Sequence, residues 1–265
     1  MNVQAISFHE REQTMTNTKG RVWIGTSNVV IPGSKKDFPL EFQAGSRLAY
    51  YGSLFRSVEL NCTFYKLPLS RTLEKWATEV PADFRFTVKL WKGITHQKKL
   101  VFDVQDIDRF MHTVDHLGSK KGCLLVQFPG SITSDYSDHV QEILERIHQQ
   151  NKDGNWQVAV ELRNASWYHE LTYELLNKYR ASLVFHDKGS SRTPKSNEAI
   201  SCVYLRYHGP RGDYKESYPD SFLQEQAEAI HQWTQSGKEV YVYFNNTIGN
   251  AFQNAQLLQK LCGGF

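Results

Sequence analysis

The stretch QVAVEL at residues 157–162 decides the fold, because it is a short apolar run that ends at a carboxylate and has seven counterparts along the chain. The eight runs are Arg21–Thr26, Ser57–Asn61, Arg85–Leu90, Gly122–Phe128, Gln157–Leu162, Ser182–His186, Cys202–His208 and Glu239–Asn245. Longer amphipathic stretches separate them. Strand-like runs that alternate with helix-like stretches are typical of βα units and a parallel sheet.

The amphipathic stretches predict seven helices. They are Gly45–Leu54, Arg71–Thr78, Val104–Leu117, Ser134–Gln149, Glu170–Tyr179, Asp220–Gln235 and Asn250–Leu261. Between Asp220 and Gln235, apolar residues recur at the spacing of a helix face that packs on a sheet. The interval after His186 has no clear helix, since Gly189–Asn197 is rich in Ser, Pro and Lys. We expect a long loop or a degenerate sixth crossover there.

The length of 265 residues suits one (β/α)8 barrel, which takes roughly 250 residues. An open doubly wound sheet alternates in the same way, but no glycine-rich nucleotide motif follows any of the runs. The sequence therefore predicts an α/β protein with a single TIM-type barrel over residues 20–265. Residues 1–19 are polar, and we expect them to form a flexible tail.

Composition limits the cellular setting and the partners. No apolar run approaches the ~20 residues of a membrane helix, and Met1–Lys19 lacks the apolar stretch of a secretory signal. The four cysteines are scattered and form no C-x-x-C pair, as is typical of reduced thiols. We expect a cytoplasmic protein without a membrane partner. A net charge of +3 is too small to indicate nucleic-acid binding, although it permits a local cationic patch.

Every predicted strand meets polar or charged residues at its end. In a parallel barrel these ends share one rim, and residues two apart lie on the same side of a strand. Catalytic residues of (β/α)8 enzymes lie at this rim, which we call the mouth. The mouth is predicted to contain Glu59, Asn61, Lys89, His96, Gln127, Glu161, Arg163, His186, Asp187, Arg206, His208, Asn245 and Asn246.

A simpler interpretation is that these charges pair with one another inside the mouth. Glu161 would then pair with Arg163 or Lys89, and Glu59 with Arg206. Such pairs are common where charges are buried.

The strand-end motifs resemble those of the YecE-like family, catalogued as domain of unknown function 72. The resemblance covers Trp23 to about Leu261, and it rests on these motifs: VELNCTFY at 58–65, FRFTVK at 84–89 with ITH at 94–96, VQFP at 126–129, VELR at 160–163 with SW at 166–167, YLRYHG at 204–209 and YFNNT at 243–247. It implies a TIM-type barrel without an established activity. The first strand departs from the family pattern, because Gly25-Thr26-Ser27 precedes Asn28-Val29 in place of Gly-Trp.

The first functional hypothesis is a site for a phosphate-containing small molecule or a nucleic acid, with hydrolysis of a phosphoester or phosphodiester as the reaction. Lys89, Arg163 and Arg206 would supply charged donors. Neutral and polar contacts would come from Asn61, His96, Gln127, Asp187, Asn245 and Asn246. Tyr65 and Trp167 would offer aromatic faces. Glu59, Glu161 and His208 are the candidate general bases.

Alternatives from other classes stay open. A divalent metal would use Glu59, Glu161, His186, Asp187 and His208, although no H-x-x-x-H or H-x-H spacing fixes two ligands on one element. No other cofactor is indicated. A non-catalytic protein would bind a nucleic acid or an anionic metabolite with the same residues.

Two further enzyme classes use single members of the mouth. A glycoside-processing enzyme would use Glu59 and Glu161 as its carboxylate pair, but their strands lie nearly across the barrel. A Schiff-base lyase would use Lys89, whose amine would have to be desolvated and its pKa lowered.

Overall fold

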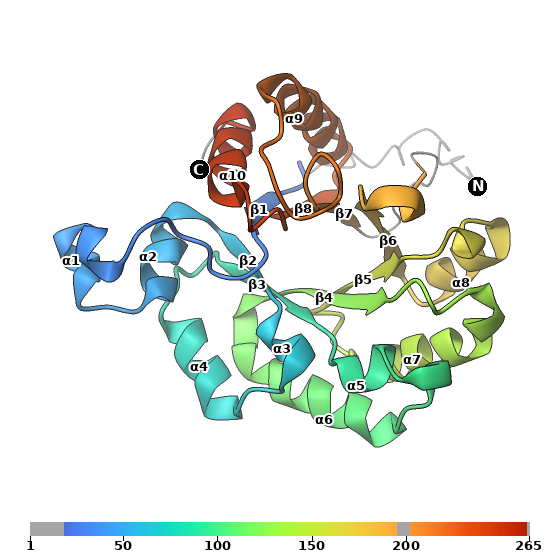
Figure 1. Cartoon of the computed structure of the whole chain (residues 1–265). Helices are drawn as coiled ribbons and strands as arrows, with labels where there is room; N and C mark the ends of the chain where they lie inside the picture. The colour runs from blue at the N-terminus through green and yellow to red at the C-terminus, as the bar shows by residue number, and fades with distance from the viewer. Residues whose placement is uncertain (1–18, 195–201, 264–265) are drawn as a thin grey trace, which may run out of the picture.

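Eight parallel strands form a nearly closed barrel in the computed structural model, which describes residues 19–194 and 202–263. The strands are β1 (Val22–Thr26), β2 (Ser57–Leu60), β3 (Arg85–Lys89), β4 (Lys121–Phe128), β5 (Gln157–Leu162), β6 (Ala181–His186), β7 (Cys202–Tyr207) and β8 (Glu239–Phe244). Neighbouring strands pair in the order β1-β8-β7-β6-β5-β4-β3-β2 (Figure 1). The predicted fold is therefore confirmed, and every strand boundary lies within one residue of its predicted position.

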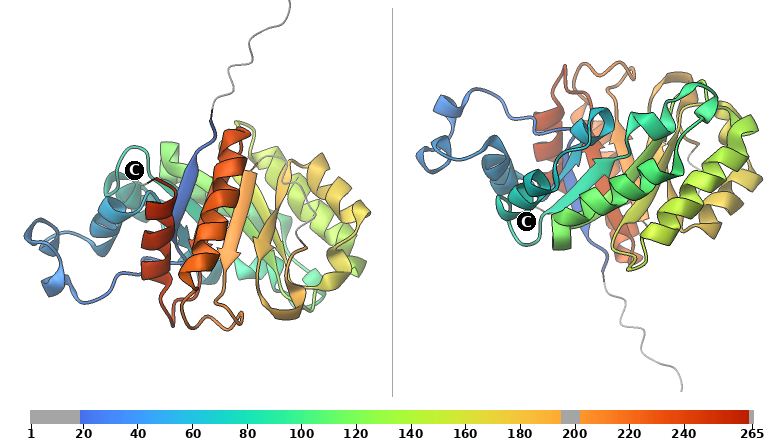
Figure 2. Two further views of the ribbon diagram at one scale, coloured as in Figure 1. Left: turned by 90° about the horizontal axis from the view of Figure 1, so that it is seen from above. Right: turned by 90° about the horizontal axis from the view of Figure 1, so that it is seen from below.

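The helices lie outside the strands (Figure 2). They are α1 (Leu40–Gln43), α2 (Arg47–Leu54), α3 (Cys62–Tyr65), α4 (Ser70–Thr78), α5 (Lys92–Thr95), α6 (Val104–Val114), α7 (Ser137–Gln150), α8 (Glu170–Lys178), α9 (Asp220–Gln235) and α10 (Ala251–Leu261). All seven predicted helices are present. The sequence missed α1, α3 and α5, because a helix of four residues is too short to show a period.

The connection between β6 and β7 is the exception to the βα pattern. Its described part contains one 3-10 turn, Gly189–Ser191, and no α-helix. Residues 195–201 lie outside the described part, and so does the end of the predicted loop at Asn197. The predicted tail likewise falls almost entirely on residues 1–18, which are not described. None of the helices in the described ranges is long and apolar enough to span a membrane.

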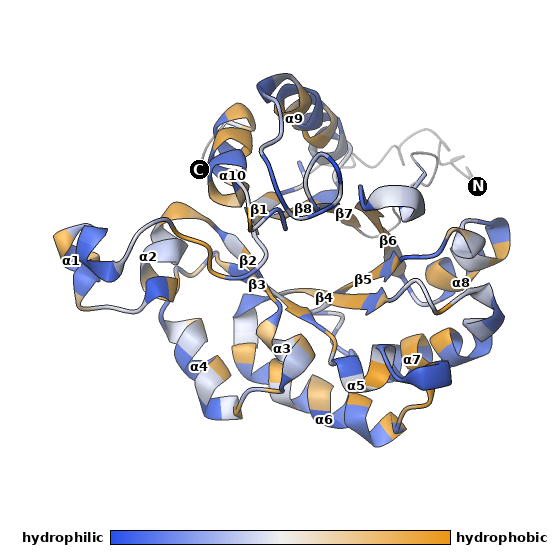
Figure 3. Cartoon of the chain, viewed as in Figure 1, coloured by the Kyte–Doolittle hydropathy of each residue, from blue (hydrophilic) through white to orange (hydrophobic). Residues whose placement is uncertain are grey.

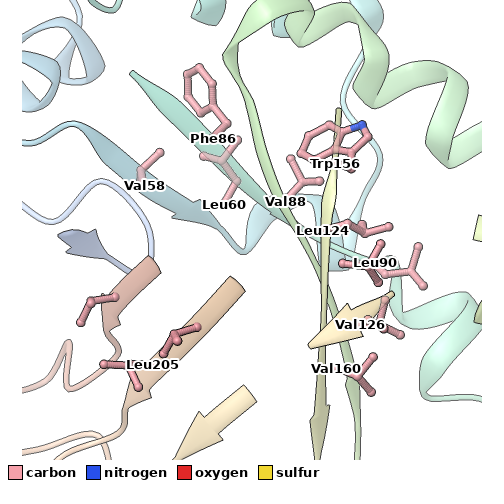
Figure 4. Packing of buried hydrophobic residues seen from close by; sticks show 14 of the residues in the cluster. Val58, Leu60, Phe86, Val88, Leu90, Leu124, Val126, Trp156, Val160 and Leu205 are labelled. Carbon is pink, nitrogen blue, oxygen red and sulfur yellow. The ribbon is translucent and has the colours of Figure 1, made fainter. Parts of the chain in front are cut away.

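Two separate sets of buried side chains fill the structure. The larger set packs between the outer face of the strands and the helices, and Figure 4 shows some of its members, such as Val88, Val126 and Val160. The smaller set fills the barrel interior and includes Leu125 and a stack of Trp23 on Tyr241 with ring centroids 4.8 Å apart. Hydrophobic residues accordingly concentrate on the strands in Figure 3.

The barrel closes between β1 and β2 through one backbone bridge and side-chain hydrogen bonds, of which those of Tyr51 reach both strands. Ser27 and Glu59 form a parallel bridge, in which Asn28 N donates to Glu59 O at 2.7 Å. Below this bridge, the buried Tyr51 hydroxyl accepts from Thr26 N at 2.8 Å and donates to Ser57 O at 3.1 Å. The tyrosine thus replaces a ladder hydrogen bond that the two strands do not make directly.

Close approach at this seam requires glycine on β1. A Cβ added to Gly25 would lie 2.0 Å from Ser57 O and 2.8 Å from the Tyr51 hydroxyl oxygen. A side chain at residue 25 would therefore push β1 away from β2.

We expect Tyr51→Phe to lower the free energy of unfolding by about 1–3 kcal/mol, because it leaves a buried N–H and a buried C=O without partners. Tyr50→Phe is the matched control, since the Tyr50 hydroxyl has no hydrogen-bond partner among the described residues, and its effect should be under ~0.5 kcal/mol. Urea unfolding followed by far-UV circular dichroism measures both values. Equal stability of the two variants would contradict the role given to Tyr51.

Candidate functional site

Each strand places one side chain into the barrel just below the mouth. The alternation of side chains along each strand continues the interior set: Gln127 follows Leu125 by two residues, and Glu161 follows Ala159. We call this layer the mouth ring. Its members are Ser27, Glu59, Lys89, Gln127, Glu161, His186, Arg206 and Asn245, and none is more than 8% exposed.

Arg206 bridges the two carboxylates of the mouth ring. Its Nη2 donates to Glu59 Oε1 at 2.9 Å, and its Nε contacts both Glu59 oxygens at 3.0 and 3.1 Å. Its Nη1 donates to Glu161 Oε2 at 2.9 Å. One guanidinium therefore binds β2, β5 and β7 together across the barrel.

Glu59 is bound by neutral donors as well. Ser27 Oγ donates to Oε1 and the Tyr204 hydroxyl donates to Oε2, each at 2.5 Å. Burial by itself would raise the pKa of Glu59, but the Arg206 charge and these hydrogen bonds outweigh it and lower the pKa. The carboxylate is therefore ionised at neutral pH.

Glu161 is the second ionised carboxylate. Arg163 Nε donates to its Oε1 at 2.5 Å, while Arg206 occupies Oε2. Burial opposes ionisation, but the charges of Arg206 and Arg163 hold the pKa of Glu161 well below its ordinary value. The expected ion pairs Glu59–Arg206 and Glu161–Arg163 are thus confirmed, whereas Glu161 makes no ion pair with Lys89.

His208 is held in one tautomer above this network. Its Nδ1 lies 3.3 Å from Asp187 Oδ1, so Nδ1 carries the proton. Its Nε2 faces Arg206 Nη1 at 3.1 Å and Arg163 Nη2 at 3.3 Å, and both of these can only donate. Burial and the Arg206 charge lower the pKa of His208 to about 4, although the Asp187 hydrogen bond opposes them. The ring is neutral, and its acceptor nitrogen is engaged.

Lys89 carries a buried amine without a carboxylate partner. Its Nζ lies 4.0 Å from the centroid of the Phe64 ring, and no ion pair to Lys89 is found in the described part of the chain. Burial, followed by repulsion from Arg206, lowers the pKa of Lys89 to about 7. His96 packs edge-on against Phe64, and burial and the Lys89 charge lower its pKa to about 4.

Three amides contribute to the mouth in different ways. Gln127 is 2% exposed, and its Nε2 donor has no partner. Asn61 begins α3, and its Oδ1 acceptor is likewise buried and unpartnered. Asn245 belongs to the mouth ring and makes no side-chain hydrogen bond among the described residues. An unpartnered buried polar atom is costly, so Gln127 and Asn61 are candidate contacts for a ligand. Asn245 is a candidate because its side-chain amide makes no bond within the described residues.

Four other predicted residues differ in what they leave open for a ligand. Trp167 is 1% exposed and donates through Nε1 to Ile132 O, so it packs in the core and has no open face. His186 bonds Leu162 O through Nε2 and accepts from Lys188 N through Nδ1.

The other two are a buried amide and a rim aromatic. Asn246 is fully buried, and its Nδ2 donates to Glu216 O and Asn254 Oδ1, which fixes two loops to each other, while its Oδ1 acceptor has no partner. Tyr65 is 65% exposed at the rim, where Lys92 Nζ lies 5.6 Å from its ring centroid.

Sequence reasoning missed Tyr204 and Lys188, and it interpreted Tyr214 and Tyr218, in the loop after Gly209, as candidates for a lid and not as fixed contacts of the mouth. Tyr204 lies two residues before Arg206, so strand alternation alone places it on the inner face of β7. Tyr218 donates to Asp187 Oδ2 and accepts from Gly209 N. Tyr214 and Lys188 approach the mouth from irregular loops, for which the sequence holds no periodic signal.

The metal hypothesis requires oxygen and nitrogen atoms that other groups already occupy. Within residues 19–194 and 202–263, no three or more His, Cys, Asp or Glu side chains are arranged to hold a metal ion. The carboxylate oxygens of Glu59 and Glu161 bind guanidinium groups, and both His186 nitrogens bond backbone. The residues predicted as ligands therefore do not fit a metal centre.

Two cavities lie at the opposite end of the barrel. They measure about 1160 and 500 Å³, and Arg21 and Trp23 at the start of β1 line both. No member of the mouth ring lines either cavity. A ligand of the mouth would therefore lie on top of the ion pairs and would not use these spaces.

We expect Arg206→Met to cost about 3–5 kcal/mol of stability at pH 7.5, because it leaves two buried carboxylates without their shared cation. The surface pair Arg146–Asp108 provides the control, and Arg146→Met should cost at most ~1 kcal/mol.

Lowering the pH to 5 should restore part of the free energy of unfolding that the Arg206→Met variant loses at pH 7.5. Without the guanidinium, burial raises the folded-state pKa of Glu59 above the unfolded value, whereas Glu161 keeps its pair with Arg163. The penalty from Glu59 therefore applies above the unfolded value and fades below it. Urea unfolding at the two pH values measures the difference. A loss that is independent of pH would contradict this account.

Comparison with known proteins supports the family resemblance that the strand-end motifs indicate. A family model described as "Protein of unknown function DUF72" matches residues 23–264. UPF0759 protein YunF of Bacillus subtilis (strain 168) is 28% identical, over 84% of this chain and 89% of that protein.

Solved structures agree with this match. A DUF72 family protein from Enterococcus faecalis V583 has a TM-score of 0.75 at 25% identity, over 91% of this chain and 95% of that chain. Another from Thermotoga maritima MSB8 has a TM-score of 0.71 at 26% identity, over 91% and 98%. Since the family model spans nearly the whole barrel, the chain belongs to the DUF72 family of proteins of unknown function.

Proposed function

We propose that this protein binds a small oxyanionic ligand, such as a phosphate-bearing metabolite, at the β3–β5 side of the mouth. The observation that carries the proposal is a pair of donors without acceptors among the described residues: Gln127 Nε2, which is fully buried, and the Lys89 ammonium, whose residue is 8% exposed. The two residues lie on neighbouring strands, where Lys89 aligns with Leu125 and Gln127 follows two residues later. An oxyanion would accept from both.

Arg163 adds a third donor to the same side. It uses Nε for Glu161 and Nη2 for His208, which leaves Nη1 without a partner among the described residues. Its side chain is 17% exposed, so this nitrogen is accessible from the rim. Charge-assisted hydrogen bonds from lysine and arginine are the usual means of holding phosphate.

The geometry favours binding over hydrolysis. The predicted general bases Glu59 and Glu161 each accept from guanidinium groups, and the acceptor nitrogen of His208 faces two of them. A glycosidase needs one carboxylic acid with a raised pKa, whereas the pKa values of Glu59 and Glu161 are both lowered. Neither reaction is therefore part of the proposal.

The pH dependence of anion binding tests the role of Lys89. Sulfate is the probe, because its charge does not change between pH 6 and 9. Lys89 is charged below its pKa of about 7 and neutral above it, so sulfate affinity should fall as the pH rises through and above 7. At pH 6, Lys89→Met should weaken binding by about tenfold to a hundredfold, since a charged hydrogen bond contributes ~1.5–3 kcal/mol. Isothermal titration calorimetry measures both effects.

Lys92→Met is the control for general electrostatics, because Lys92 is exposed on the rim outside the mouth ring. It should retain the affinity and the pH profile of the wild type. Sulfate binding that is equally strong in Lys89→Met would overturn the proposal. Titration with a single-stranded oligonucleotide shows whether the same donors also hold a polymer.

A second candidate function is favoured by the state of the Lys89 amine. An amine with a pKa of about 7 is about half deprotonated, and to that extent nucleophilic, at pH 7, and burial and a neighbouring cation are the means by which Schiff-base lysines are activated. In that reaction the amine attacks a carbonyl carbon, and water leaves as the imine forms. The mouth would then process an anionic aldehyde or ketone.

Reductive trapping separates this candidate from simple binding. Incubation with dihydroxyacetone phosphate or pyruvate and sodium borohydride should add the reduced adduct to the peptide that contains Lys89, as read by mass spectrometry. Lys89→Arg should abolish the adduct, and exposed lysines such as Lys98 should label no faster than in the unfolded protein. Equal labelling of all lysines would contradict the Schiff-base candidate, but it would not contradict anion binding.

A further inference from the structure

The loop after β7 lies against the mouth in a strained backbone conformation. Tyr214 has φ +70° and Glu216 has φ +62°, in the left-handed region that non-glycine residues rarely adopt. Such conformations cost of order 1–3 kcal/mol and persist only where the surroundings fix them. Strain of this kind gathers at ligand sites.

Backbone hydrogen bonds fix the loop on both sides. Tyr214 N donates to His208 O at 2.6 Å, and Tyr214 O accepts from Ile248 N at 3.0 Å. Glu216 O accepts from Asn250 N at 3.1 Å and from Asn246 Nδ2 at 2.9 Å. The loop is therefore a fixed wall of the mouth, and the position of Tyr214 is set before any ligand arrives.

The Tyr214 side chain lies among positive charges. Its ring packs edge-on against His208 with centroids 5.5 Å apart, and Lys188 Nζ lies 4.1 Å from its centroid. Burial would raise the pKa of Tyr214, but Lys188, Arg163 and Arg206 lower it. The hydroxyl is thus a strong hydrogen-bond donor in a positive environment. The Lys188 ammonium donates to Gly212 O at 3.3 Å, and with three N–H groups it has capacity for further acceptors.

Two groups of donors therefore face each other across the mouth. Lys89 lies on β3, while Lys188 follows β6 and Tyr214 follows β7, which is four strands from β3 in the eight-stranded order. Arg163 lies between them, since it bonds His208 beneath Tyr214 and also influences the charge states of Lys89 and His96.

We propose that the ligand of the mouth carries two oxyanionic groups, one bound by Lys89 and Gln127 and the other by the Tyr214 hydroxyl and the Lys188 ammonium. Arg163 contacts the part between them. This inference rests on the proposed anion binding and names the class of ligand: a phosphate or phosphonate joined by a short linker to a second phosphate or a carboxylate. A single oxyanion would satisfy the donors at one end only.

Matched pairs of ligands test the second group. Phosphonoacetate, phosphonopropionate and phosphonobutyrate are each compared with the alkylphosphonate of the same length by isothermal titration calorimetry at pH 6.5. At one linker length, the carboxylate should improve affinity by about tenfold or more, as one charge-assisted hydrogen bond contributes ~1.5–3 kcal/mol. Tyr214→Phe and Lys188→Met should each remove most of that gain and leave alkylphosphonate binding within twofold of the wild type.

The outcomes separate this inference from the function on which it rests. If neither ligand of any pair binds, or if Lys89→Met binds alkylphosphonates like the wild type, the proposed anion site itself is wrong. If alkylphosphonates bind through Lys89 but no carboxylate improves affinity, only the second group is wrong. Tyr65→Phe is the control, because its hydroxyl lies on the exposed rim, and it should change neither series.

Discussion

The Arg206 guanidinium, placed between Glu59 and Glu161, is the constraint on which the mouth depends. A buried carboxylate pair without a cation would be strongly destabilising, and a lone buried guanidinium would be equally costly. Together they form a network that joins β2, β5 and β7, and Ser27 extends it to β1. The carboxyl ends of strands far apart in the sequence are thereby held in one arrangement.

The same network determines what chemistry is left for a ligand. Because both carboxylates are neutralised, they offer neither a free base nor an acid, and His208 is engaged by the same guanidinium groups. The positive charge of Arg206 also acts on Lys89, whose amine is left without a counterion. Charged donor capacity is therefore what remains at the mouth, while Asn61 Oδ1 is a neutral acceptor that stays unpartnered.

The sequence predicts the barrel and the members of the mouth well, because alternation along a strand and alternation of strands with helices are local patterns. It proposes the pair of Glu59 with Arg206 but does not decide whether Glu161 pairs with Arg163 or with Lys89. Glu161 and Arg163 are two residues apart and share a face, whereas Glu59 and Arg206 pair only because the barrel closes. Trp167 was predicted to contact the ligand but packs in the core, where it donates to Ile132 O. The sequence pattern of an aromatic residue after a strand is the same in both cases.

The seam between β1 and β2 has a consequence for how the chain acquires its structure. β1 pairs along its length with β8, from Val22 with Val240 to Thr26 with Phe244, while its neighbour in sequence offers one bridge and the Tyr51 hydroxyl. During synthesis the first strand therefore lacks a ladder partner until the last strand has left the ribosome. Seven strands can align in order as they emerge, but ring closure waits for β8 and joins the first and last strands of the barrel.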